Sequence, residues 1–167
     1  IDIGALAREV VESYGARAHA KQLTLQCASP PHPVPALGDR TAIRIILDNL
    51  ISNAVKYSPP GRAIDMRIRN GAGVVRIEVA DQGPGLTPAD HQRLFHKYAR
   101  LSAKPTGNEQ STGVGLSIVK SLVTRMNGRV WCESEVGHGA TFIVEMPAPD
   151  SASASGAAQP TPIAPEP

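Results

Sequence analysis

The sequence predicts an α+β fold, a two-layer sandwich in which helices cover one face of a mixed and mostly antiparallel sheet. Two pairs of alternating segments predict antiparallel hairpins, and segments with helical periodicity precede and separate them. No repeated order of strand, helix and strand occurs, which disfavours a parallel sheet with helices on both faces. A length of 167 residues supports one hydrophobic core, so we expect a single domain over residues 1–147.

The N-terminal segment is predicted to be helical, because Ile3, Leu6, Val10 and Tyr14 recur at helical spacing. The alternating residues 23–27, LTLQC, predict a short strand, which a proline-rich connector follows.

The clearest helix begins after Asp39, which suits the N-cap position, and stops at the turn sequence Ser58-Pro59-Pro60-Gly61. Between these positions, apolar side chains recur three and four residues apart and predict one buried face: Ile43, Ile46, Leu47, Leu50, Ile51 and Ala54.

Two hairpins and a further helix complete the predicted domain. Residues 64–69 and 74–81 alternate around a turn sequence, Asn70-Gly71-Ala72-Gly73. A helix is predicted from near Gly113 to the C-terminal signal Asn127-Gly128. The second hairpin pairs residues 129–134 with residues 140–146. Residues 148–167 consist mainly of Pro, Ala and Ser, so we expect this tail to be disordered.

Charge and composition argue against several function classes. The formal net charge is only +2, so no broad basic surface indicates nucleic acid as a partner. Cys27 and Cys132 lie far apart without metal-binding spacing, which argues against a zinc site and a disulfide framework. No apolar run approaches the ~20 residues of a membrane span, and no signal peptide opens the chain. We expect a cytoplasmic piece of a longer protein, since the chain starts inside a helical pattern without Met.

Asn49, Asn53 and Lys56 lie four and three residues apart, so one stripe of the predicted helix carries all three. A solvated helix face is the simplest interpretation of this stripe. Asparagine is, however, a poor helix former, and its neutral oxygen suits Mg²⁺, which often bridges to phosphates. Lys56 would reach the same phosphates as a point charge. The stripe is therefore a candidate site for a metal and phosphates.

Asp81 follows a predicted strand directly and is followed by Gly83 and Gly85. A carboxylate at a strand end accepts hydrogen bonds from an exocyclic amine, and the glycines let a flat ring approach the main chain. Taken alone, this short motif is better explained by an ordinary turn.

A second glycine pair, Gly113 and Gly115, opens a predicted helix, whose N-terminal N–H groups suit phosphate oxygens. Simple packing is the alternative, and no GxxxxGK[ST] phosphate loop occurs. Residues 99–112, between the two glycine pairs, form a long polar loop that suits a lid, and Phe95 and Tyr98 are candidates for its hinge.

The order of these features closely resembles the catalytic and ATP-binding domain of bacterial sensor histidine kinases, which have the Bergerat ATP-binding fold. LDNLISNAVKYSP resembles the family's N box, DQGPGL its first glycine box, and LFHKYARL its F box. STGVGLSIVK resembles its second glycine box, and GHGATF its closing strand motif. The resemblance covers residues 1–147.

The resemblance implies ATP and Mg²⁺ as cofactors and a role for each matching residue. Asn53 would hold Mg²⁺ with support from Asn49, and Lys56 would contact phosphate. Tyr57 would pack on adenine, and Asp81 would accept a hydrogen bond from its amino group. Gly83 and Gly85 would shape the adenine pocket, and Thr141 would approach Asp81 through water. Arg100 would steady the γ-phosphate. The triphosphate end would be lined by Thr112, Gly113, Gly115 and Leu116.

The resemblance also implies phosphoryl transfer in two-component signalling. Hydrolysing relatives carry a Glu where this chain has Asn49, and an amide is no general base. Asn49, Lys56 and Arg100 would then serve the transfer itself. The acceptor would be a histidine on a dimerisation domain, with a response regulator as an indirect partner. None of the histidines present has the sequence setting of that acceptor: His19, His32, His91, His96 and His138.

Three alternatives remain open at the level of sequence. An anti-sigma-type serine kinase has the same fold, although the basic F box argues against it. A non-catalytic signalling scaffold would bind nucleotide weakly or not at all, which intact Asn53 and Asp81 disfavour. A DNA-topology or repair ATPase is disfavoured by Asn49.

Overall fold

Five strands form one mixed sheet in the order β1-β2-β3-β5-β4 in a computed structural model that describes residues 1–107 and 113–149. β1 runs parallel to β2, and all the other neighbours are antiparallel. The two predicted hairpins, β2–β3 and β4–β5, are confirmed. The strands are β1 (Thr24–Ala28), β2 (Ala63–Gly71), β3 (Val74–Asp81), β4 (Arg129–Ser134) and β5 (Ala140–Pro147).

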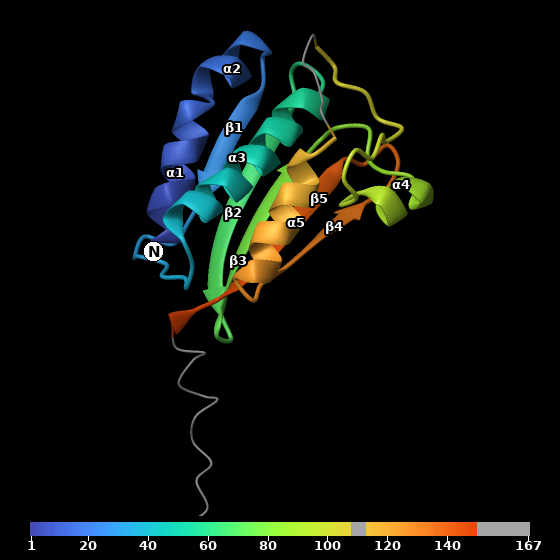
Figure 1. Cartoon of the computed structure of the whole chain (residues 1–167). Coiled ribbons are helices and arrows are strands. Elements are labelled where there is room, and N and C mark those ends of the chain that lie inside the picture. The colour runs from blue at the N-terminus through green and yellow to red at the C-terminus, as the bar shows by residue number, and fades with distance from the viewer. Residues whose placement is uncertain (108–112, 150–167) are drawn as a thin grey trace, which may run out of the picture.

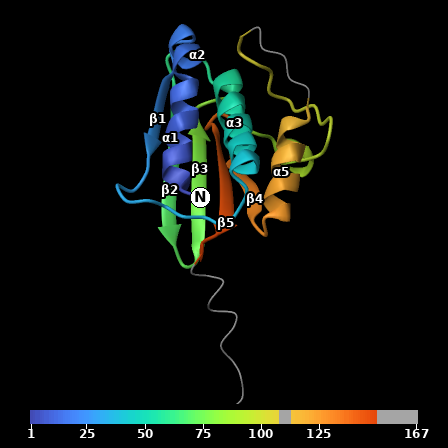
Figure 2. The ribbon, with the colours of Figure 1, turned by 60° about the vertical axis from the view of Figure 1, so that its left-hand side comes forward.

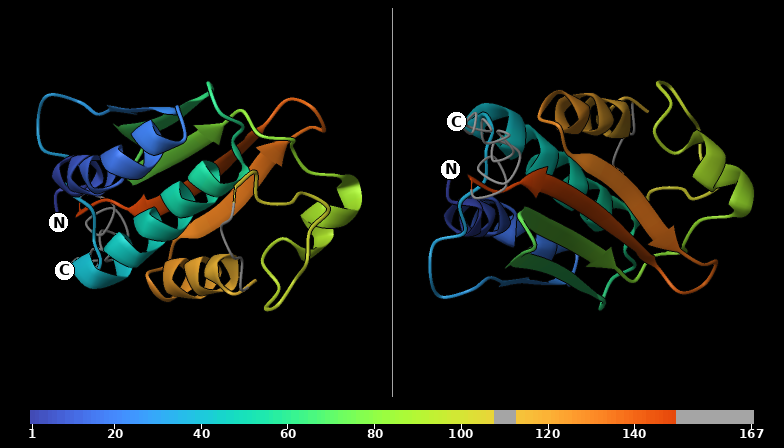
Figure 3. Two further views of the ribbon diagram at one scale, coloured as in Figure 1. Left: turned by 90° about the horizontal axis from the view of Figure 1, so that it is seen from above. Right: turned by 90° about the horizontal axis from the view of Figure 1, so that it is seen from below.

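The helices form a second layer on one face of this sheet, which confirms the predicted two-layer architecture (Figures 1 and 2). They are α1 (Ile3–Ser13), α2 (Gly15–Ala20), α3 (Arg40–Tyr57), α4 (Pro88–Arg93) and α5 (Gly115–Arg125). Views along the vertical axis show α1, α3 and α5 on the same side of the strands, with α4 set apart near the end of β4 (Figure 3). Within the described part of the chain, no helix is both long and apolar enough to cross a membrane.

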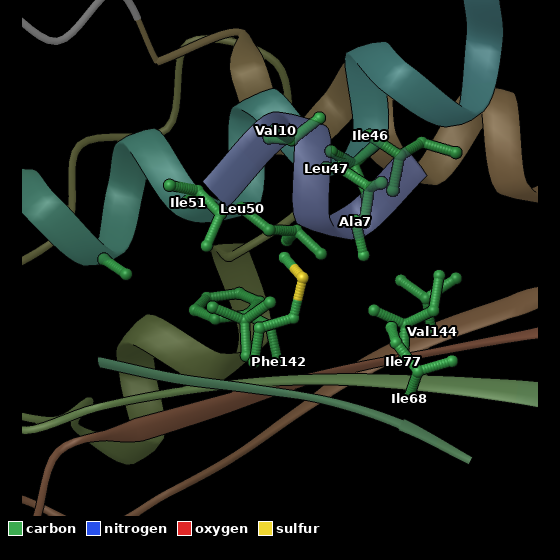
Figure 4. Packing of buried hydrophobic residues seen from close by; sticks show 14 of the residues in the cluster. Ala7, Val10, Ile46, Leu47, Leu50, Ile51, Ile68, Ile77, Phe142 and Val144 are labelled. Carbon is green, nitrogen blue, oxygen red and sulfur yellow. The ribbon is translucent and has the colours of Figure 1, made fainter. Parts of the chain in front are cut away.

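The hydrophobic core lies between α1, α3 and the sheet. Figure 4 shows Ile46, Leu47, Leu50 and Ile51 pointing from α3 toward the strands, as the three-four spacing predicts. All four side chains are fully buried. Each such side chain contributes roughly 1.5–3 kcal/mol through burial, so this face fixes α3 against the sheet.

Both ends of α3 have a local cause. Asp39 is the N-cap, and its carboxylate accepts a hydrogen bond from the Ala42 N–H at 2.7 Å, as predicted. Ser58 adopts an extended conformation and ends the helix before Pro59. The stripe of Asn49, Asn53 and Lys56 is thus carried by a rigid, buried helix.

The structure differs from the sequence-based expectation at three places. The N-terminal helix is divided into α1 and α2 at Tyr14, and α5 begins at Gly115, two residues later than expected. α4 was not predicted, although Thr87 and Asp90 form a capping box around Pro88. A six-residue helix leaves too short a hydrophobic period to stand out in sequence.

The predicted tail begins just past β5. Ala148 is buried, and its N–H donates to the Gly73 carbonyl oxygen at 2.9 Å. Residues 150–167, to which most of the prediction of disorder applies, lie outside the described residues.

Candidate functional site

A cavity of about 620 Å³ lies between α3, the loop after β3, the segment 98–105 and the start of α5. This volume is in the range of small-molecule sites. Most of the residues singled out in the sequence line it, although they come from distant segments of the chain: Asn49, Asn53, Lys56, Tyr57, Asp81, Gly85, Arg100, Gly113, Gly115 and Leu116.

The α3 side of the cavity carries the predicted polar stripe. Asn49 donates from Nδ2 to the Ile45 carbonyl oxygen at 2.8 Å, which directs its Oδ1 toward the start of α5. A Cβ atom on Gly115 would lie only 2.5 Å from this Oδ1. Gly115 therefore lets the Asn49 amide approach the start of α5 closely, and a Cβ there would require the Asn49 side chain to move.

Asp81 ends β3 with its side chain facing the cavity. Its Oδ1 accepts hydrogen bonds from the N–H groups of Gly83 at 2.9 Å and Ala140 at 3.2 Å. Burial raises the pKa of this carboxyl group, and the two hydrogen bonds oppose the rise. Among the described residues, Oδ2 has no protein hydrogen-bond donor.

The loop that carries Gly85 is fixed onto the turn between β4 and β5. Gly85 has a φ of +73°, and a Cβ there would collide with the Glu135 carbonyl group. Ser134 accepts from the Leu86 N–H at 2.9 Å and donates to the Gly139 carbonyl oxygen at 2.6 Å. Sequence reasoning missed Ser134, because a serine at the end of a predicted strand gives no local signal of this contact.

Two predicted site residues do not line the main cavity, and a third is not among the described residues. Thr141 does not line it, because Ala140 and Phe142 do so and side chains alternate along β5. Gly83 lines a neighbouring hollow, and it supports the main cavity through its N–H bond to Asp81 and its close approach to the Tyr57 carbonyl oxygen. Thr112 lies outside the described residues.

The residue just before the predicted lid, Tyr98, has a left-handed backbone conformation. Tyr98, with a φ of +59°, donates its N–H to the Gly113 carbonyl oxygen at 2.8 Å, which joins the two ends of the predicted loop. Phe95 packs against the core, and Lys120 of α5 lies over its ring at 5.9 Å. Residues 99–107 are described, and Arg100 and Lys104 from this segment line the cavity.

A buried carboxylate, Asp90, fixes this segment to α4. Its Oδ1 accepts from the N–H and the hydroxyl group of Ser102 at 3.0 and 3.1 Å. Its Oδ2 accepts from the Thr87 N–H at 3.1 Å, as part of the capping box. Burial alone would raise the pKa of Asp90, but the hydrogen bonds from Ser102 and Thr87 outweigh it and hold the pKa below its usual value.

Comparison with known protein families identifies this arrangement. Residues 38–150, well over half of the chain, match the family described as histidine kinase-, DNA gyrase B-, and HSP90-like ATPase. The chain belongs to this ATPase family. The match includes the α3 stripe, Asp81 and both glycine pairs.

Curated members of the ATPase family place the chain among sensor kinases. It is 34% identical over 155 residues to the sensor protein EvgS of Escherichia coli K12, covering 88% of this chain and 12% of EvgS. It is 31% identical over 147 residues to the sensor-like histidine kinase SenX3 of Mycolicibacterium smegmatis, covering 88% of this chain and 38% of SenX3. The chain thus spans 12% to 38% of the length of these relatives.

Solved structures of histidine kinases have a fold similar to that of this chain. Full-length ShkA, solved in complex with AMPPNP, has a TM-score of 0.77 at 34% identity, with 89% of this chain and 30% of ShkA covered. The catalytic domain of histidine kinase ThkA also has a TM-score of 0.77, at 23% identity, with 89% and 93% covered. The expected resemblance is confirmed, and the chain is an ATP-binding catalytic domain of the sensor histidine kinase type.

Proposed function

We propose that this domain binds Mg-ATP in the 620 Å³ cavity and transfers the γ-phosphate to a histidine on a dimerisation domain outside this chain. One observation carries the proposal. A single cavity joins a strand-end carboxylate, a stripe of neutral and basic polar side chains on α3, and the glycine-rich start of a helix. These are the separate requirements of a nucleobase, a metal ion and a polyphosphate.

The adenine end of the cavity is assigned to Asp81. Its Oδ1 is held by two main-chain donors, so Oδ2 can accept a hydrogen bond from the exocyclic amine. Tyr57 lines the cavity from α3 and offers an aromatic face, and Gly85 adds no side chain to the space beside it. Thr141 does not line the cavity, so the approach to Asp81 that we propose for it is through water.

The phosphate end is assigned to α3 and the start of α5. Asn53 offers a neutral oxygen to Mg²⁺, which usually keeps several waters and bridges phosphate oxygens. Lys56 and Arg100 supply positive charge toward the phosphates. Gly113, Gly115 and Leu116 lie where the N-terminal N–H groups of α5 favour an anion, and Thr112 belongs to the same sequence motif.

Transfer is favoured over hydrolysis by the identity of Asn49. This residue lines the cavity beside Asn53, and its amide cannot remove a proton from water. Phosphoryl transfer needs mainly positioning and neutralisation of charge, with the nucleophile in line with the γ-phosphate. The chain supplies the first two, and a histidine on a partner domain supplies the third.

We propose the wider setting by analogy with the relatives. The phosphorylated dimerisation domain would pass its phosphoryl group to a response regulator, as two-component signalling requires. A further similar structure is described as the cytoplasmic segment of histidine kinase QseC, with a TM-score of 0.63 at 20% identity. We place this domain on the cytoplasmic side of the cell, where ATP is available.

A phosphotransfer assay tests this proposal. The domain is mixed with radiolabelled ATP, Mg²⁺ and the histidine-bearing dimerisation domain of its parent protein. We expect acid-labile label on the dimerisation domain, and none when its acceptor histidine is replaced by Gln. Asn53→Ala should abolish transfer. Label that appears on serine of a partner would instead support a serine kinase, and ATP binding without any transfer would support a signalling scaffold.

A further inference from the structure

The C-terminal turn of α3 receives hydrogen bonds from two segments that are far apart in the sequence. Lys21, directly after α2, donates from Nζ to the carbonyl oxygens of Val55 at 2.6 Å and Lys56 at 3.0 Å. Thr106, from the lid segment, donates its N–H to the Lys56 carbonyl oxygen at 2.9 Å. The Thr106 hydroxyl lies 3.1 Å from that same oxygen and 2.9 Å from the Ser58 carbonyl oxygen.

These contacts have a clear physical reason. The last carbonyl groups of a helix have no partner within the helix and carry a partial negative charge. An ammonium group and a hydroxyl group satisfy them, and a hydrogen bond from a charged donor contributes more than a neutral one. Lys21 and Thr106 therefore stabilise the turn of α3 from two opposite partners, α2 and the lid.

The stabilised turn carries two side chains of the nucleotide cavity. Lys56 and Tyr57 are the last residues of α3, and both line the cavity. Their Cα positions follow the main chain that Lys21 and Thr106 hold. A shift of this turn would move a proposed phosphate contact and a proposed adenine contact together.

The Lys56 carbonyl oxygen accepts hydrogen bonds from both Lys21 and Thr106. Together the two residues direct three donor groups at this atom. Because both residues hold the same carbonyl group in place, loss of the Lys21 contact lets the turn shift and weakens the hydrogen bond from the Thr106 N–H. Thr106 is also close to Ser102, which Asp90 fixes to α4, so residues 102–106 are anchored at both ends.

We propose that Lys21 and Thr106 are positioning residues of the nucleotide site and that, through the Lys56 carbonyl group, they couple the N-terminal helices to the lid. The positioning role rests on the proposed function. The coupling between α2 and the lid does not, because its contacts exist without nucleotide.

Amide hydrogen exchange at Thr106, measured by NMR without nucleotide, tests the coupling. In Lys21→Met, the Thr106 N–H should exchange faster, on the order of fivefold, the change expected when one hydrogen bond is weakened. Arg17→Met is the matched control, because it also removes one positive charge near the end of α2, whereas the Arg17 guanidinium group lies over the Tyr14 ring at 5.3 Å and not at the last turn of α3. Its exchange at Thr106 should equal that of the wild type.

Two outcomes would overturn the coupling: unchanged Thr106 exchange in a folded Lys21→Met variant, or equal acceleration by Arg17→Met. Cooperative thermal melting reports whether each variant folds. If Lys21→Met fails to fold, Lys21→Gln is compared with Arg17→Gln by the same criterion, because glutamine removes the charged donor while it keeps a polar side chain at this position.

Titration with a non-hydrolysable ATP analogue tests the positioning role separately. Lys21→Met should weaken binding by about fivefold. Lys21→Arg, which keeps a charged donor, should restore most of it. Normal affinity in Lys21→Met contradicts the positioning role. Absence of binding in the wild type contradicts the proposed function instead and leaves the exchange experiment as the test of coupling.

Discussion

At the scale of single residues, Asp81 has opposing effects on binding and stability. Burial raises its pKa in the folded protein, so the folded state binds this proton more tightly than the unfolded chain. The group therefore costs no stability at pH values below both pKa values. It destabilises the fold increasingly as the pH rises through them, and this cost is fully present above the folded-state pKa. The ionised form is nevertheless the better acceptor for an adenine amino group.

Asp81→Asn should separate these two effects. Its side-chain oxygen can still accept from Gly83 and Ala140, so the loop remains in place. We expect ATP affinity to fall by roughly 10- to 100-fold, the range for losing a hydrogen bond to a charged group. The melting temperature at neutral pH should not fall, and any gain over the wild type should vanish in acid. Calorimetry and melting curves across pH measure both, and unchanged ATP affinity would refute the assignment of Asp81.

Gly85 and Gly61 allow backbone strain to be separated from steric collision. Both have left-handed backbone conformations, with φ values of +73° and +81°. A Cβ on Gly85 would meet the Glu135 carbonyl group, whereas nothing lies within 4 Å of a Cβ on Gly61.

Gly61→Ala should therefore cost only about 1 kcal/mol of unfolding free energy, from backbone strain. Gly85→Ala should cost at least about 2 kcal/mol more, since the loop must also leave the β4–β5 turn. Denaturant unfolding of the two variants gives the comparison. Equal losses would show that the loop adapts without strain and that its docking on this turn is loose.

At the scale of elements, Asp90 joins α4 to residues 99–107, the described part of the predicted lid. Its lowered pKa means that the stability it contributes is present above the unfolded pKa and is lost as the pH falls through the folded pKa. Asp90→Ala removes the capping box and leaves the Ser102 and Thr87 donors without their acceptor. We expect a loss of roughly 2–4 kcal/mol from these two causes together.

Chemical unfolding at neutral pH measures this loss, and the gap between Asp90→Ala and wild type should narrow in acid. Glu12→Ala, an exposed carboxylate on the far helix α1, is the control and should change stability by less than about 0.5 kcal/mol. A loss at Asp90 no greater than at Glu12 would show that the buried carboxylate does not hold α4 and the lid together.

At the scale of the whole molecule, the helices and hairpins that depend on short-range sequence patterns could be predicted. The hairpins and α3 were predicted well, because alternation, turn residues and the Asp39 cap act over short distances. The parallel pairing of β1 with β2 has no local signal, since it joins residues about forty positions apart.

The candidate site was predicted to the extent that its residues belong to recognisable motifs. Asn53, Asp81 and the second glycine pair meet at one cavity as expected. Thr141 does not line the cavity, because side chains alternate along β5, and its approach to Asp81 through water stays a prediction. Ser134, Lys21 and Thr106 were missed, because their contacts depend on tertiary structure alone.

The central claim is that this domain binds Mg-ATP in the cavity beside α3. Calorimetric titration with a non-hydrolysable ATP analogue, with and without Mg²⁺, tests it most directly. We predict saturable binding that Mg²⁺ strengthens, and in Asn53→Ala the Mg²⁺ effect should be lost while metal-free binding persists. No binding at millimolar nucleotide, or binding that ignores Mg²⁺ in the wild type, would contradict the claim.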